Sequence, residues 1–177
     1  MNATLATWNT ADESAALDAM LACCGSREWA RAMVAQRPIA SVWALSQTAD
    51  RLWSTMQEAD WLEAFACHPR IGEHKPALVT SNSSHDPVER SAAWSRKEQL
   101  SVRAANELVL AELAEDNQRY EQHFGFTYIV CATGKSAAEM LTILKRRLAN
   151  DREAELHEAA EQQRQIMQIR LGKWLAE

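Results

Sequence analysis

The stretch Cys67-His68-Pro69-Arg70-Ile71-Gly72-Glu73-His74-Lys75-Pro76 interrupts the helical pattern of this chain with two prolines and a glycine. Pro69 fixes its own φ angle and moves the preceding residue away from the helical region, so we expect a helix to stop at His68. His68 would then project from that helix end beside the charged side chains of Arg70 and Glu73. Histidine titrates near neutral pH, so a histidine held in this way can transfer a proton, although it can equally well be a structural residue.

The sequence on both sides of this break is typical of helices. Its 177 residues include only 5 glycines and 4 prolines, while alanine, leucine, glutamate, glutamine and arginine are abundant. This composition favours an all-α fold, and the length suits one domain over residues 1–177 with a sizeable core. We therefore predict a single-domain multi-helix bundle with one long loop after the His-Pro break. Most of the 7 tryptophans should be large core residues.

Capping residues and helix breakers set the expected helix boundaries. The predicted helices cover residues 10 or 12 to 23, 26–36, 41–57, 60–67, 88 or 95 to 123, 136–148 and 151–174, with the long loop at 68–87. The run Thr127-Tyr128-Ile129-Val130-Cys131-Ala132 is extended in character but has no partner strands, so we expect a short extended segment buried among helices. Its backbone N–H and C=O groups then need turns, water or a planar polar ligand as partners.

Charge and targeting signals exclude several classes of protein. The net charge is −5, and no basic stripe is present, which argues against binding to nucleic acid or an anionic membrane surface. No apolar run is long enough to cross a bilayer, and residues 1–8 lack the parts of a signal peptide. We therefore expect a cytoplasmic protein.

Cysteine spacing and motif searches also give negative results. Cys23 and Cys24 are adjacent, Cys67 and Cys131 are isolated, and no CxxC pair suggests a zinc site, so reduced and mostly buried thiols are expected. The sequence contains no GxSxG, GxGxxG, GxxxxGK[ST] or HExxH motif.

Two further places could carry chemistry. Ser95 and Glu98 have the Ser-x-x-Glu spacing of a capping box, which would make both residues purely structural. Arg170 lies on an apolar stripe with Ile166, Met167 and Trp174, which is unusual for arginine. It either extends along the edge of the core to water or is a buried guanidinium that binds a carboxylate or amide ligand.

Several motifs together match one known family. They are His68-Pro69-Arg70-Ile71-Gly72, Ser95-Arg96-Lys97-Glu98-Gln99, Phe124-Gly125-Phe126 with the Tyr128–Ala132 run, Arg147-Leu148-x-Asn150, and Ile169-Arg170-Leu171. With them the chain resembles the 2-oxo-4-hydroxy-4-carboxy-5-ureidoimidazoline (OHCU) decarboxylase family, which completes the route from urate to S-allantoin. The resemblance extends from about Trp53 to Trp174, and it departs at Thr127, where the family usually has proline. It implies an all-helical enzyme with a small-molecule substrate, a homodimer, and neither metal nor organic cofactor.

The resemblance also assigns roles by position. His68 matches the catalytic histidine as general acid or base, and Glu98 and Arg170 match the other charged site residues. Glu98 would bond hydroxyl or ureido N–H groups of the substrate, and Arg170 would bond a substrate acceptor. The substrate-contacting positions are Pro69, Ser95, Arg96, Lys97, Glu98, Gln99, Tyr128, Ile129, Val130, Cys131 and Ala132. A C=N bond in the substrate ring would accept the electron pair left by CO2.

Two other classes of function stay open at this level. A non-enzymatic helical ligand-binding or adaptor domain would keep the fold and the helix caps without needing His68 to titrate. A metal-dependent hydrolase would need His68, Glu73, His74 and His85 as ligands, but their spacing matches no helical metal motif.

Overall fold

The computed structural model describes residues 2–71, 94 and 107–177, which contain eight helices and no strand. The helices are α1 (Ala3–Thr10), α2 (Glu13–Cys24), α3 (Arg27–Ala35), α4 (Val42–Trp53), α5 (Glu58–Ala66), α7 (Glu107–Phe124), α8 (Ala137–Arg147) and α9 (Arg152–Trp174). The predicted all-α fold is confirmed. Most of the predicted loop at 68–87, and residues 88–106 of the predicted long helix except Trp94, lie outside the described residues. None of the described helices combines the length and the apolar character that a membrane span requires.

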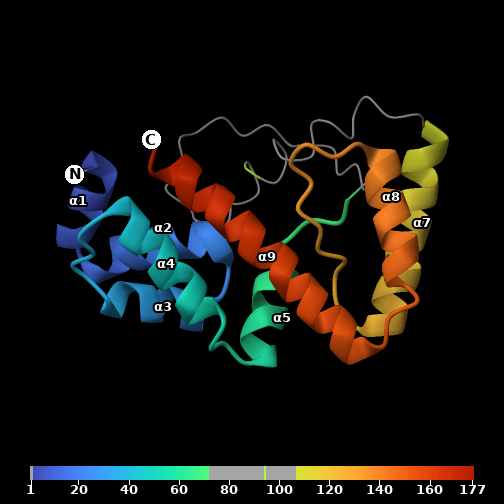
Figure 1. The fold of residues 1–177 in the computed structure, drawn as a ribbon, viewed down its shortest axis with the longest axis horizontal. Coiled ribbons are helices and arrows are strands. Elements are labelled where there is room, and N and C mark those ends of the chain that lie inside the picture. The colour runs from blue at the N-terminus through green and yellow to red at the C-terminus, as the bar shows by residue number, and fades with distance from the viewer. Residues whose placement is uncertain (1, 72–93, 95–106) are drawn as a thin grey trace.

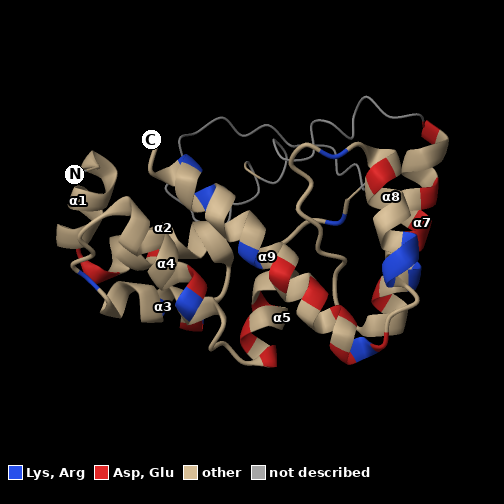
Figure 2. Ribbon diagram, in the orientation of Figure 1, with Lys and Arg blue, Asp and Glu red and all other residues tan. Residues whose placement is uncertain are grey.

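Helix α9 connects two groups of helices. Figure 1 shows it running diagonally from the α7–α8 pair to the group formed by α1–α4, with α5 beside its middle. It packs against α2, α4 and α5, while α7 packs against α8. A buried hydrogen bond from Trp53 Nε1 to Ala160 O (3.0 Å) fixes α4 against α9. Both signs of charge occur along α7, α8 and the neighbouring half of α9, whereas α1 has no charged residue (Figure 2).

The predicted helix starts are confirmed where a side chain caps its own helix. Ser26, Ser41, Ser136 and Asp151 each accept a hydrogen bond from the N–H three residues later. Gly25 ends α2 with φ +86, a conformation that glycine adopts without steric cost.

Two boundaries differ from the prediction. The sequence predicts no helix before residue 10, yet α1 is present because contacts with distant residues hold it: Trp8 Nε1 donates to Ala16 O (2.9 Å) and Asn2 Nδ2 to Leu175 O (3.0 Å). The break between α4 and α5 comes earlier than predicted, at residues 54–57. Asp60 is therefore not the cap of α5; its carboxylate accepts from Gln57 N–H (2.9 Å), and Gln57 is the first flanking residue.

Most tryptophans are core residues, as predicted. Five are buried, Trp61 is partly buried, and Trp43 is 73% exposed. The buried ones are Trp8, Trp29, Trp53, Trp94 and Trp174.

Candidate functional site

The turn that carries His68 is fixed at both of its ends. Helix α5 finishes at Ala66, and His68 N–H donates to Phe65 O (3.1 Å) in a last tight turn. Just beyond it, the guanidinium of Arg70 makes two bonds to the carboxylate of Glu121 on α7 (2.7 and 2.6 Å). Asn117 Nδ2, also on α7, donates to Ile71 O (2.8 Å). The sequence prediction of a helix end held by Pro69 is confirmed to within two residues, and α7 supplies the anchors.

The side chain of His68 faces a buried amide. Although the residue is partly exposed, its Nε2 is buried and has no hydrogen-bond partner among the residues that the structure describes. Gln163 Oε1 on α9 is also buried and unpartnered within that part of the chain. The amide of Gln163 is oriented by its other atom, because Nε2 donates to Cys24 O (3.0 Å). Within the described residues neither atom meets hydrogen-bond geometry, although Gln163 lies close enough to His68 to act on its pKa.

The environment of His68 keeps its imidazole neutral. Burial lowers the pKa of His68 most, the positive charge of Arg170 lowers it further, and Gln163 opposes them, with a net value of about 3. At neutral pH the ring therefore has one N–H donor and one lone-pair acceptor. An imidazole in this state is ready to accept a proton when an anionic ligand offsets the charge of Arg170.

Arg170 is a buried guanidinium. It is 0% exposed on α9, seven residues after Gln163 and on nearly the same helix face. Its side chain therefore does not extend along the core edge to water, and its charge acts on both His68 and Cys24. Burial raises the pKa of the Cys24 thiol to about 12 against the lowering effect of Ser26, Gln163 and Arg170. The pKa of Cys67 is also raised, chiefly by burial, so neither thiol is an activated nucleophile.

The extended segment is buried among the helices, as predicted, with Tyr128 through Ala132 each at most 6% exposed, and the structure places it next to α9. Arg147 Nη1 donates to Ile129 O (2.7 Å), and Cys131 N–H donates to Gln162 Oε1 (2.9 Å). Within the described residues, the N–H and C=O of Val130 make no hydrogen bond. Because Gln162 and Gln163 are adjacent on α9, these open backbone groups and the His68 pair lie near one helix.

The structure brings together only part of the predicted site. His68 and Arg170 lie close enough for their charges to interact, the Tyr128–Ala132 segment bonds Gln162 on α9, and Pro69 is exposed beside His68. The predicted positions Ser95, Arg96, Lys97, Glu98 and Gln99 lie outside the described residues. Gln163 was not predicted, although it lies on the same stripe of α9 as Arg170. Among the described residues, no group of three or more His, Cys, Asp or Glu side chains could hold a metal ion.

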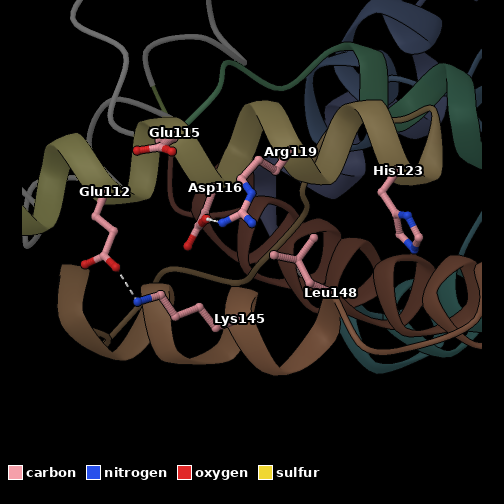
Figure 3. A pocket seen from close by; sticks show the side chains of 7 residues that line it. All are labelled: Glu112, Glu115, Asp116, Arg119, His123, Lys145 and Leu148. Atoms are coloured by element: carbon pink, nitrogen blue, oxygen red, sulfur yellow. Dashed lines mark hydrogen bonds and ion pairs between the residues drawn. The ribbon is translucent and has the colours of Figure 1, made fainter.

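A separate cavity of about 580 Å³ lies between α7 and α8 and contains none of these residues. Figure 3 shows it lined by acidic and basic side chains, with Glu112 bonded to Lys145 and Asp116 to Arg119. Four of its charged side chains are paired with one another in this way, and the cavity contains neither His68 nor Arg170, so we place the candidate site at those two residues instead.

Sequence comparison shows what this chain is similar to. The family profile described as OHCU decarboxylase matches residues 9–172. The chain is 37% identical over 152 residues to the uric acid degradation bifunctional protein TTL of Arabidopsis thaliana, a match that covers 85% of this chain and 44% of that protein. It is 26% identical over 135 residues to the uric acid degradation bifunctional protein of Bacillus sp. (strain TB-90), covering 76% and 24%. The chain therefore spans less than half the length of these two relatives.

Solved structures have the same fold. A crystal structure of OHCU decarboxylase in the presence of (S)-allantoin superposes with a TM-score of 0.75 at 33% identity, covering 90% of this chain and 99% of that one. A crystal structure of (S)-allantoin synthase gives a TM-score of 0.68 at 15% identity, covering 96% and 53%. The second likeness concerns the fold alone.

Proposed function

The chain belongs to the OHCU decarboxylase family, and from this membership we propose that it removes CO2 from OHCU and releases S-allantoin without a metal or organic cofactor. A relative at 33% identity was crystallised in the presence of (S)-allantoin, which supports this choice of product. The observation that carries the proposal is the buried Nε2 of His68, which has no hydrogen-bond partner in the described part of the chain and lies beside Gln163 and the Arg170 charge.

The main task of the protein is to orient the bond that breaks, because the substrate itself supplies the electron sink. Loss of CO2 leaves an electron pair on the ring carbon, and the adjacent C=N bond of the substrate accepts it. Catalysis then depends on holding the carboxylate out of the ring plane and on placing one proton. The N–H and C=O of Val130, which have no partner among the described residues, would match the flat ring or the ureido arm.

We assign the proton transfer in this reaction to His68. The hydroxyl on the carbon that loses CO2 gives up a proton as it becomes a carbonyl, and the neighbouring carbon gains one. Neutral His68 can accept the first proton and deliver it to the neighbouring carbon, which returns the imidazole to its starting state. The ring nitrogen of the C=N bond, which received the electron pair, takes a second proton from solvent. Delivery to one face of the ring would give a single enantiomer.

Arg170 and Glu98 would hold the substrate. Arg170 would bond an acceptor of the substrate, but not the departing carboxylate too strongly, because equal stabilisation of ground and transition states gains no rate. Glu98 would accept bonds from hydroxyl or ureido N–H groups. The homodimer and the cytoplasmic location implied at the sequence level stay predictions.

The test is an assay of freshly generated OHCU, with S-allantoin measured by circular dichroism. Removal of a general acid or base costs about a hundred- to ten-thousand-fold in rate, so His68→Gln should fold normally and lose most activity. The control is His157→Gln, which changes an exposed histidine on α9 and should keep wild-type turnover. A His68→Gln protein with near wild-type turnover would overturn the assignment.

A further inference from the structure

A fully buried ion pair lies beside the extended segment, and neither of its members is among the residues assigned to the site so far. Arg147, on the last turn of α8, and Glu155, on α9, are both 0% exposed. Arg147 Nε donates to Glu155 Oε1 (2.7 Å), and Nη2 lies 2.5 Å from the same oxygen. Buried ion pairs rarely stabilise a fold more than well-packed apolar residues of equal volume. We therefore look for a role of the Arg147–Glu155 pair other than stabilising the fold.

The remaining donor of this guanidinium reaches the segment itself. Arg147 Nη1 donates to Ile129 O (2.7 Å), and the guanidinium carbon lies 4.9 Å from the centre of the Tyr128 ring. Arg147 thus contacts two consecutive residues of the segment, one by a hydrogen bond to the backbone and one by a cation–π contact. The next residue of the segment is Val130, whose N–H and C=O make no hydrogen bond with any residue that the structure describes.

The orientation of Arg147 is itself fixed. Its carboxylate partner Glu155 accepts a bond from the Tyr120 hydroxyl, and Asn150 Nδ2 donates to Glu155 Oε2 (2.8 Å). Burial disfavours the charge of Arg147, but Glu155 outweighs this effect and the pKa of Arg147 is raised. The guanidinium therefore stays charged, and three helices determine where its Nη1 points.

We propose that Arg147 is a positioning residue for the substrate: its bond to Ile129 O sets the path of residues 128–132, so that the backbone groups of Val130 face the ligand. Glu155 aims Arg147 and touches no substrate. The link to substrate rests on the proposed function, whereas the effect on the segment does not.

The experiment compares three variants with wild type. The double variant Arg147→Met/Glu155→Met replaces the pair with apolar side chains of similar volume, so it should fold, with a lowered melting temperature because the Tyr120 hydroxyl and Ile129 O lose their partners. Arg147→Lys keeps a charge for Glu155 but loses the planar fork that also reaches Ile129 O. The control is Tyr120→Phe, which removes the hydroxyl bond to Glu155 and the long bond from Arg147 Nη2 (3.4 Å) but leaves the Arg147–Ile129 bond in place.

Amide hydrogen exchange in residues 128–132 and steady-state kinetics are measured on each protein. We expect exchange at least ten-fold faster, and kcat/KM at least ten-fold lower, in the double variant and in Arg147→Lys. Tyr120→Phe should lower the melting temperature without either effect. If either folded Arg147 variant keeps wild-type exchange and kcat/KM, Arg147 is structural only and the proposal fails. If wild-type protein does not turn over OHCU, the proposed function fails, while the exchange data still decide whether Arg147 sets the segment.

Discussion

The close approach of α2 to the residue before His68 makes a substitution at Gly25 informative. Gly25 has φ +86, and a Cβ added there would lie 2.9 Å from both Cβ and Sγ of Cys67. The left-handed conformation costs about 1–2 kcal/mol for a residue with a Cβ, and forcing extra volume into a packed contact costs about 1–3 kcal/mol. We therefore expect Gly25→Ala to lower the free energy of unfolding by about 2–5 kcal/mol. Because Cys67 must move, His68 should move with it, and small displacements at reacting groups reduce rates up to about a hundred-fold.

Gly125→Ala is the matched control. Gly125 follows the end of α7 with φ +80, but a Cβ there would meet nothing within 4 Å. It should show only the conformational cost of about 1–2 kcal/mol and a smaller loss of kcat. The assay is urea denaturation followed by tryptophan fluorescence, together with OHCU turnover. Equal losses of stability in the two variants, or unchanged kcat in Gly25→Ala, would refute the reasoning that the Cys67 contact positions His68.

The remaining predictions concern the charged groups of the site. Arg170→Lys keeps the charge but loses the planar fork, so kcat/KM should fall at least ten-fold; wild-type kinetics would argue against ligand binding by Arg170. Because the pKa of His68 falls from 6.5 to about 3 on folding, the unfolded chain binds a proton that the folded chain does not. Stability should therefore decrease as pH drops below about 6.5, by up to about 1.4 kcal/mol per pH unit, and urea titrations of His68→Gln should lack this slope. Glu98→Gln should lower activity at least ten-fold with an unchanged melting temperature, whereas Ser95→Ala should cost about 0.5–2 kcal/mol of stability with a smaller effect on turnover; the reverse pattern would make the motif only a helix cap.

Sequence reasoning succeeded where a side chain acts on its own neighbourhood. Ser26, Ser41 and Ser136 each bond an N–H three residues away, so their positions alone predict the start of a helix. Pro69 restricts the residue before it by local sterics, and the end of α5 follows within two residues. Because the helix neighbours of Arg170 are apolar, its sequence position predicted either a guanidinium that reaches water or a buried one, and the structure shows the buried one.

Contacts between helices leave no such local signal. Gln163 is 139 residues from Cys24, whose carbonyl orients its amide, and an isolated glutamine in a helix gives no hint of that contact. Arg147 was recognised only as part of a family motif, since an arginine at the end of a charged helix usually faces water. Its burial depends on how α7, α8 and α9 meet, which cannot be deduced from periodicity.

Glu155, Gln163 and Arg170 all lie on the single helix α9, which holds them at fixed angles around its axis. An α-helix rotates by about 100° per residue, so inserting one residue between Gln163 and Arg170 would swing the guanidinium about a quarter of a circle away from His68. Two full turns separate these residues, and only changes of about a whole turn would restore the phase. Insertions and deletions in this enzyme family should therefore avoid this stretch of α9 and occur in the connections between helices. The number of residues between Gln163 and Arg170 should stay constant.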